Sequence, residues 1–266
     1  MLREITLGQY YPAESVLHSL DPRVKLFSTL VFIITLFSAD NAVLFAIVLL
    51  SMIGIIRLSH VPFSFMVKGL KAIVVLLIIA GLFNLFLTPG KTLVSFWILS
   101  ISDVGLKNAV LMTSRMILLI VGTSIMTLTT TPNQLTDGLE KSLGFMKKFN
   151  VPVHEISMMM SIALRFIPIL IEETDKIMKA QMARGADFES GGLITKAKNM
   201  VPLLVPLFVS AFRRANDLSL AMEARCYNGG EGRTKMHPLK YNSLDQRAYI
   251  CVALYIILFF AVKVIL

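Results

Sequence analysis

Two short segments of the sequence place an arginine at the same spacing from two alanines. The segments AQMARG (180–185) and AMEARC (221–226) share the pattern Ala-x-x-Ala-Arg. On a helix, residues at i, i+3 and i+4 lie on one face, so each segment presents two small side chains beside one long cation. The guanidinium offers five donors to carboxylate or carbonyl oxygens, and the alanines permit close approach. This chemistry is that of a helix end that fits into a groove on a partner.

Each pattern falls at the predicted end of a long helix. The first helix extends from about Pro152 to Arg184, and Gly185 stands where a C-terminal capping glycine is expected. This helix would be about 50 Å long, so a kink at Pro168 is predicted. The second helix covers Thr195 to Arg225. Both arginines therefore belong to the last turn of a helix.

A simpler interpretation of Arg184 and Arg225 is electrostatic. Cations near the C-terminus of a helix compensate the negative end of its dipole and need no partner. The repetition of the pattern forty-one residues later, on the next helix of the same charged region, favours the docking interpretation.

The composition predicts an integral membrane protein. Of the 266 residues 55% are hydrophobic and 16% charged, and the mean hydropathy is +0.72. The net charge of +9 is expected from Lys and Arg in cytoplasmic loops, so membrane lipid and not nucleic acid is the predicted surrounding. Five apolar stretches are candidates for spans of about 20 residues, the first two being short unless their flanks join the helix: Leu26–Phe37, Ala42–Ile56, Ala72–Leu87, Val104–Leu128 and Tyr249–Leu266.

Basic residues set the expected orientation of these spans. They precede the first span and fill the loop between the second and third, whereas the loop after the first span offers only Asp40. By the positive-inside rule the N-terminus is cytoplasmic, and five spans place the C-terminus outside in a multi-pass membrane protein. The basic residues are Arg3, Arg23 and Lys25, followed by Arg57, Lys68 and Lys71.

The predicted fold is therefore an all-α integral membrane protein with about five transmembrane helices and three amphipathic cytoplasmic coupling helices. Residues 1–131 form an N-terminal membrane region with four transmembrane helices, 132–244 form the cytoplasmic coupling-helix module, and 245–266 form a C-terminal transmembrane helix. The first module helix has a strong start signal, because Thr131 and Gln134 match a capping box around Pro132.

Residue patterns that would support catalysis are not found in the sequence. The chain lacks a G-x-x-x-x-G-K-[ST] phosphate loop, its four histidines are scattered, and Cys226 and Cys251 have no metal-ligand spacing. We therefore expect a non-catalytic chain without a cofactor or metal. A self-contained channel or secondary transporter is the alternative, but it predicts polar residues near mid-membrane, where the spans carry little beyond Asn84 and Arg115.

Three groups of charges permit structural interpretations. Arg115 lies within the fourth span, where an ionisable residue is a functional candidate, but closeness to the outer end favours anchoring by snorkelling. Arg165 is expected to pair with an acidic residue of its own helix, Glu172 or Glu173 on the C-terminal side or Glu155 on the other. Asp21 and Pro22 predict a helix start, which would make Arg23 and Lys25 membrane-surface anchors.

Several motifs together resemble a known family. GQYYPAESVLHSLDPRVKL (8–26), with its His-x-Leu-Asp-Pro-Arg-x-Lys core, TTTPNQL (129–135), ALRFIP (163–168) and the two Ala-Arg helix ends are similar to segments of the transmembrane T component of energy-coupling factor (ECF) transporters, which are ABC-type importers of vitamins and metal ions. The resemblance covers essentially the whole chain. Where the family commonly has Gly after the second Ala-Arg, this sequence has Cys226.

The resemblance implies both partners and roles. Two ABC-type ATPase subunits bind and hydrolyse ATP, one or several substrate-binding S components capture the substrate, and the T component joins them. The Ala-Arg ends would sit in one groove on each ATPase, which assigns ATPase coupling to Ala183, Arg184 and Gly185 and to Ala224 and Arg225.

A run of three methionines offers a second candidate surface. Flexible, polarizable methionine suits a face that repacks against several partners, although methionine also serves as ordinary apolar filler. We expect Met158, Met159 and Met160, with Phe166, to help bind interchangeable S components.

Overall fold

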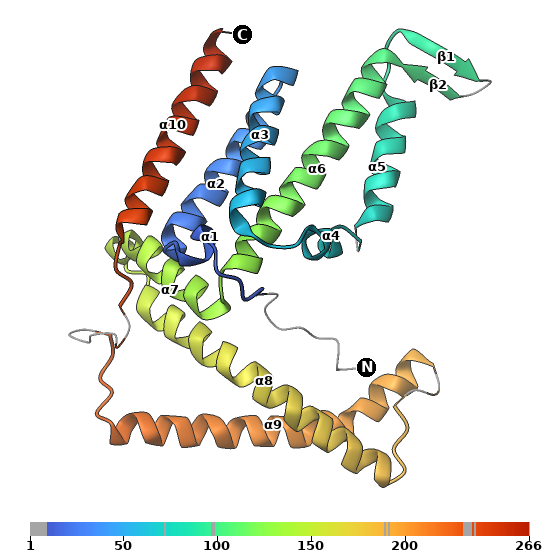
Figure 1. Ribbon diagram of the computed structural model, residues 1–266. Helices are drawn as coiled ribbons and strands as arrows, with labels where there is room; N and C mark the ends of the chain where they lie inside the picture. The colour runs from blue at the N-terminus through green and yellow to red at the C-terminus, as the bar shows by residue number, and fades with distance from the viewer. Residues whose placement is uncertain are drawn as a thin grey trace. The chain divides into compact units, whose positions relative to one another are not determined.

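The structure is a computed structural model, and its elements are mostly helices (Figure 1). Contacts divide the chain into two compact units, which we call the membrane unit (within 8–138 and 239–266) and the α8–α9 unit (139–238). The predicted cytoplasmic module, 132–244, includes all of the α8–α9 unit. The residues described are 10–71, 73–96, 99–188, 190, 192–230, 236 and 238–265.

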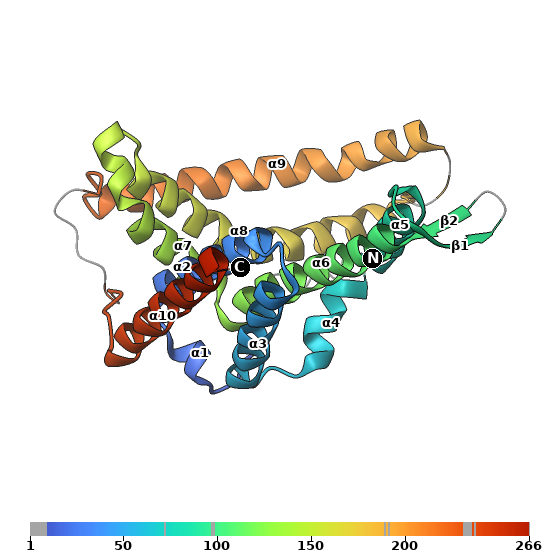
Figure 2. The same cartoon turned by 90° about the horizontal axis from the view of Figure 1, so that it is seen from above.

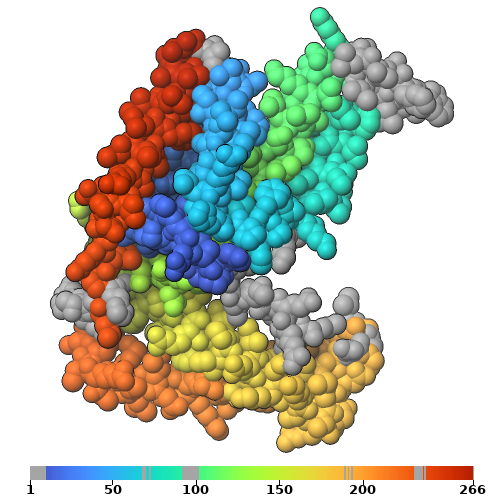
Figure 3. Space-filling view, in the orientation of Figure 1, coloured from blue at the N-terminus to red at the C-terminus, as the bar shows by residue number. Residues whose placement is uncertain are grey.

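The membrane unit is organised around its longest helix, α6. This helix, Asp103–Thr129, packs against four preceding helices, and α10 packs against two of these. Figure 3 shows α10 lying alongside α3. The four helices are α2 (Pro22–Ser38), α3 (Ala42–Ser59), α4 (Phe63–Lys71) and α5 (Val74–Leu87). The short helix α1 (Val16–Ser19) packs against α3, and α10 is Ser243–Ile265.

Local signals in the sequence explain where several helices begin. Asp21 caps α2 by accepting from the backbone N–H of Arg23, and Pro22 occupies the first helical position, as predicted. The predicted capping box of α7 (Pro132–Ser142) is also present. The Thr131 hydroxyl accepts from the Gln134 N–H at 3.3 Å, and the Gln134 side chain accepts from the Thr131 N–H at 3.1 Å.

The core of the membrane unit is a cluster of apolar side chains from α2, α3, α4, α6 and α10. Burial of this surface stabilises the packing of the helices to one another, while the remaining apolar faces stay outside the core. The buried members are Phe32, Leu36, Ala39, Leu44, Val48, Met52, Val61, Met66, Val121, Ile125, Leu128 and Phe259.

The structure confirms an all-α membrane protein and refines its spans. Among the described residues, four helices are long and apolar enough to cross a membrane: α3, α6, α8 (Val153–Ala183) and α10. α2 extends beyond the predicted stretch on both sides but measures about 26 Å, and α5 about 21 Å. Among the four, α8 has the lowest mean hydropathy, 1.4. Its later turns carry Glu172, Glu173 and Asp175, which agrees with an amphipathic helix.

A β-hairpin replaces part of an apolar segment before α6. Strands β1 (Thr92–Phe96) and β2 (Leu99–Ser102) pair antiparallel, with Thr92 opposite Ser102 and Phe96 opposite Leu99. The register shifts between Thr92 and Val94. The all-α expectation therefore holds for the helical body but misses this short hairpin.

The α8–α9 unit consists mainly of two long helices. A 3-10 helix, Leu143–Phe149, follows α7, and α9 covers Leu193–Ala224. Both long helices continue through their internal prolines, Pro168 in α8 and Pro202 and Pro206 in α9. Figures 1 and 2 draw each as one continuous helix, and Figure 1 shows that α9 bends near its N-terminal end.

Candidate functional site

The first Ala-Arg segment ends α8 in a Schellman motif. Ala183 is the last helical residue, Arg184 is the C-cap, and Gly185 adopts a left-handed φ of 91°. The N–H of Gly185 donates to the Met182 carbonyl at 2.9 Å, and the N–H of Ala186 donates to the Gln181 carbonyl at 3.0 Å. These bonds satisfy carbonyls that a helix end leaves open. We call Ala183–Gly185 the first tip.

The second segment ends α9 with the same bonds. Ala224 is the last helical residue and Arg225 the C-cap. The N–H of Cys226 donates to the Glu223 carbonyl at 2.8 Å, and the N–H of Tyr227 donates to the Met222 carbonyl at 3.0 Å. Cys226 therefore occupies the left-handed position, with a φ of 54°. We call Ala224–Cys226 the second tip.

Both tips lie on the surface of the α8–α9 unit. All six residues of the two tips are exposed. Within the described part of the chain, neither Arg184 nor Arg225 makes a side-chain hydrogen bond or ion pair. An exposed arginine without an intramolecular partner keeps all of its donors for another molecule. The same placement also suits dipole compensation, so geometry alone leaves both interpretations open.

Contacts between α8 and α9 position the tips. Arg214 on α9 donates to Glu173 on α8 at 2.9 Å, and the Gln181 amide near the end of α8 donates to the Pro202 carbonyl near the start of α9 at 3.3 Å. The first tip thus lies near the beginning of α9, and the second tip is about 33 Å further along, at its far end. Figure 1 shows the two ends apart. One narrow groove cannot hold both tips.

The methionine run does not form a single surface. Met159 and Met160 are exposed, whereas Met158 and Phe166 are half-buried. Three successive helical residues spread over about 200° of the circumference, but Met159 and Phe166, seven positions apart, share a face. The structure therefore places Met159 and Phe166 on one face of α8.

The sequence also indicates an amphipathic segment at Val201 to Phe212, but we assigned no site to it, and it forms an apolar surface on α9. Six apolar residues at helical spacing are each about half exposed or more, and the rings of Phe208 and Phe212 lie 5.5 Å apart. Their recurrence at steps of three and four was the available signal. We call this surface the α9 stripe: Val201, Leu204, Val205, Phe208, Val209 and Phe212.

Two predicted roles for arginines have different outcomes. Arg115 donates to the Ala39 carbonyl at 2.7 Å, at the C-cap of α2, which supports the structural interpretation. The predicted pairing of Arg165 is wrong for the described residues, since it is exposed and Glu173 binds Arg214 instead. The pair joins two helices and not two turns of one helix.

Lys25 and Arg23 do not serve as membrane-surface anchors. Lys25 is only 6% exposed, and its amine donates to the Thr129 carbonyl at 2.8 Å. Arg23 pairs with Asp21 at 2.8 Å. Burial raises the pKa of Asp21, but hydrogen bonds from the side chain and backbone of Arg23 outweigh it, so this pKa lies below its ordinary value.

Among the described residues, no group of three or more His, Cys, Asp or Glu side chains could hold a metal.

Comparison with known proteins identifies the family. A sequence model of the family described as "Cobalt transport protein" matches residues 13–236. The chain is 51% identical over 253 residues to the energy-coupling factor transporter transmembrane protein EcfT of Clostridium kluyveri, covering 94% of each chain. It is 49% identical over 253 residues to the EcfT of Thermosediminibacter oceani, covering 95% of this chain and 96% of the relative. It is 46% identical over 262 residues to the EcfT of Bacillus subtilis, covering 98% and 99%. The protein with the two exposed Ala-Arg tips therefore belongs to the family of transmembrane components of energy-coupling factor transporters.

Proposed function

We propose that this chain couples ATP hydrolysis by two partner ATPases to the movement of a substrate-binding S component, as the scaffold of an importer for vitamins or other micronutrients. The observation that carries the proposal is the pair of tips. They share one backbone geometry, are exposed, and keep their arginines without partners among the described residues.

The separation of the tips favours one tip for each ATPase. Because the second tip lies about 33 Å along α9 from Pro202, the two tips fit separate grooves. When ATP draws two ATPases together, helices whose ends are held in those grooves must move as well. ATP is then bound and hydrolysed only in the partners, and this chain is non-catalytic.

The apolar faces of α8 and α9 are the proposed S-component surface. Met159 on α8 is exposed beside the half-buried Phe166, and the α9 stripe exposes aliphatic and aromatic side chains. Such a surface can repack against different partners, so one chain can serve one or several S components. Met158 and Met160 flank this face. Crosslinking from Met159 that never captures an S component would contradict the assignment.

The proposed orientation puts the N-terminus and both tips on the cytoplasmic side of a bacterial cell membrane, with the C-terminus outside. Arg23, Arg57 and Lys71 lie at helix ends that then face the cytoplasm. Lys263, near the opposite end of α10, donates to the Ser38 carbonyl at 2.9 Å. This lysine is held by the end of α2. With Lys91 and Lys107 it is one of few basic residues on the outer side, so the charge bias toward the cytoplasm remains.

The test is co-purification of the tagged chain with two candidate ATPases from the same genome. Wild type is compared with the Arg184→Ala, Arg225→Ala double variant, and recovery of ATPase in detergent is measured. We expect recovery to fall at least about tenfold, since charge-assisted bidentate bonds are lost at both tips. Equal recovery would reduce the arginines to helix-end charges. Failure of the wild type to retain ATPase would favour a self-contained channel or secondary transporter.

A charge-conserving variant separates docking from dipole compensation. In Arg184→Lys, Arg225→Lys the cation remains at each helix end, but the planar fork is lost. Docking predicts that ATPase recovery still falls, whereas dipole compensation predicts wild-type recovery.

A further inference from the structure

The His-x-Leu-Asp-Pro-Arg-x-Lys motif is the sequence signature that the tips do not explain. Within the described residues the chain passes between its two units at two places. We call Gly138 to Leu139, within α7, the outgoing crossing, and Pro238 to Leu239, before α10, the returning crossing. Four residues of the motif contact the chain on the membrane-unit side of these crossings. The motif residues are His18, Leu20, Asp21, Pro22, Arg23 and Lys25.

At the outgoing crossing, Lys25 and Pro22 make the contacts. The buried amine of Lys25 donates to the carbonyl of Thr129, the last residue of α6, and to the His18 carbonyl at 3.3 Å. A Cβ added to Gly138 would lie 3.0 Å from the Cβ of Pro22. The last residue before the crossing therefore packs directly on the motif, at a spacing that a larger side chain would disturb.

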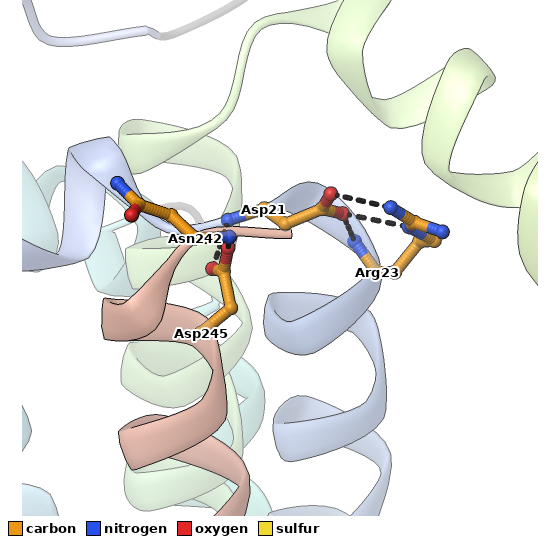
Figure 4. A network of polar contacts seen from close by, with 4 residues as sticks. All are labelled: Asp21, Arg23, Asn242 and Asp245. Carbon is orange, nitrogen blue, oxygen red and sulfur yellow. Dashed lines mark hydrogen bonds and ion pairs between the residues drawn. The ribbon is translucent and has the colours of Figure 1, made fainter. Parts of the chain in front are cut away.

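At the returning crossing, Asp245 joins two helix starts, as Figure 4 shows. This carboxylate is 1% exposed. One oxygen accepts from the backbone N–H of Asp21 at 2.8 Å, and the other accepts from the N–H of Asn242 at 2.7 Å. The Arg23 guanidinium also lies 3.8 Å from the centre of the Tyr241 ring. The starts of α2 and α10 are thus tied by a buried carboxylate and a cation–π contact.

The charges of this cluster balance. Asp21 and Asp245 face Arg23 and Lys25, and the two carboxylates accept five hydrogen bonds between them. Removal of one member of such a buried set leaves its partner without compensation, so the arrangement is rigid and sensitive to single changes.

We infer that Asp21–Lys25 and Asp245 form a joint that transmits movement of the α8–α9 unit into the membrane helices. The joint holds the start of α2, the end of α6 and the start of α10 together, so that a pull on either crossing moves them as one body. The inference rests on the proposed function, because the pull originates at the tips. Asp245 is a positioning residue, acting through the helix starts that it binds.

The test measures movement in the complete complex with both ATPases, in lipid, with and without Mg-ATP and vanadate. One spin-label pair, at Lys176 and Asp217, reports the α8–α9 unit, and a second, at Leu82 and Ile257, reports α10 against α5; all four positions are exposed. Native cysteines are replaced by serine. In the wild type both distances should change on ATP binding.

Asp245→Asn is the main variant, because the amide has only one acceptor oxygen for two N–H donors. We expect the ATP-driven change of the first pair to persist and that of the second pair to fall to less than about half. Thr35→Val is the matched control. It also removes a hydrogen bond between α2 and α10, the 2.9 Å bond from the buried Thr35 to Tyr255. This bond lies away from the crossings, so both distance changes should remain intact.

The outcomes separate the joint from the docking proposal. If the first pair does not respond to ATP in wild type, tip coupling fails and the joint fails with it. A first pair that responds, with a second pair unaffected by Asp245→Asn, overturns the joint alone. Equal losses in both pairs, or in Thr35→Val, would indicate a merely structural role. If Asp245→Asn does not assemble, Gly138→Ala, which adds one carbon against Pro22, must reduce the second change selectively.

Discussion

α8 and α9 end in the same hydrogen-bond pattern but with different residues at its left-handed position. Gly185 adopts positive φ without steric cost, whereas Cys226 adopts it against the preference of a residue with a Cβ. At both ends the hydrogen bonds join equivalent positions, and the arginine at the C-cap is exposed. The difference shows that the backbone turn, and not glycine itself, is the shared feature that presents each arginine.

The largest effect is expected from filling the space beside each arginine. Ala183→Trp and Ala224→Trp replace exposed methyl groups, so the free chain should lose less than about 0.5 kcal/mol of stability. In a groove the added ring cannot fit, and ATPase affinity should fall about 30-fold for either single change. Titration of labelled ATPase against the chain in nanodiscs measures this loss.

Ala215→Trp, at an exposed alanine of α9 outside the tips, is the control for bulk alone. It should leave ATPase affinity unchanged. Affinity that falls equally in all three variants would contradict specific docking at the tips. A loss confined to one tip would show that the two ends differ in function as well as in sequence.

The next effect concerns the turn at the first tip. Gly185→Ala places a Cβ at a φ of 91° and should destabilise the helix end by about 1 to 2 kcal/mol. The N–H of Ala186, which donates to the Gln181 carbonyl, should then exchange with solvent about 5- to 30-fold faster. The Tyr227 N–H at the second tip serves as an internal control and should be unaffected.

Sequence patterns predicted the tips because their determinants are local. The spacing of Ala and Arg and a glycine after the last turn define a helix end within a few residues. The capping box at Thr131 and Gln134 and the Asp-Pro start of α2 were predicted for the same reason. The left-handed conformation of Cys226 was not predicted, because cysteine disfavours positive φ. The turn at the end of α9 requires this conformation whichever residue stands there.

Long-range partners were beyond sequence reasoning. Lys25 precedes an apolar stretch and was expected at the membrane surface, but its acceptor Thr129 is brought near only by the packing of α2 against α6. Glu173 was expected to pair within α8, and its partner Arg214 comes from α9. Helical spacing identifies possible ion-pair partners on the same helix. It gives no information on partners that tertiary packing brings from another helix.

A smaller effect, of opposite sign, is expected at the second tip. Cys226→Gly relieves the positive φ and should stabilise the end of α9 by about 0.5 to 1 kcal/mol. Exchange of the Tyr227 N–H should slow about two- to fivefold. Cys226→Ser keeps the Cβ and removes the thiol, so its exchange should match wild type; slowing in both variants would point to the thiol and not to the backbone.

The smallest effect is expected from the ion pair that links the helices bearing the two tips. Glu173→Gln keeps the shape of the side chain but removes its charge from Arg214, and both side chains are partly exposed. Pairs of this kind contribute about 0.5 kcal/mol or less, so the α8–α9 contact should persist. The spin-label distance between Lys176 and Asp217 should keep its mean value and broaden slightly, and ATPase recovery should stay within about twofold of wild type. Arg165→Gln is the control, since this exposed arginine makes no ion pair among the described residues and its loss should not change the distribution. A collapse of ATPase recovery in Glu173→Gln alone would mean that the pair fixes the spacing of the tips, and that their separation, more than the chemistry of either end, determines docking.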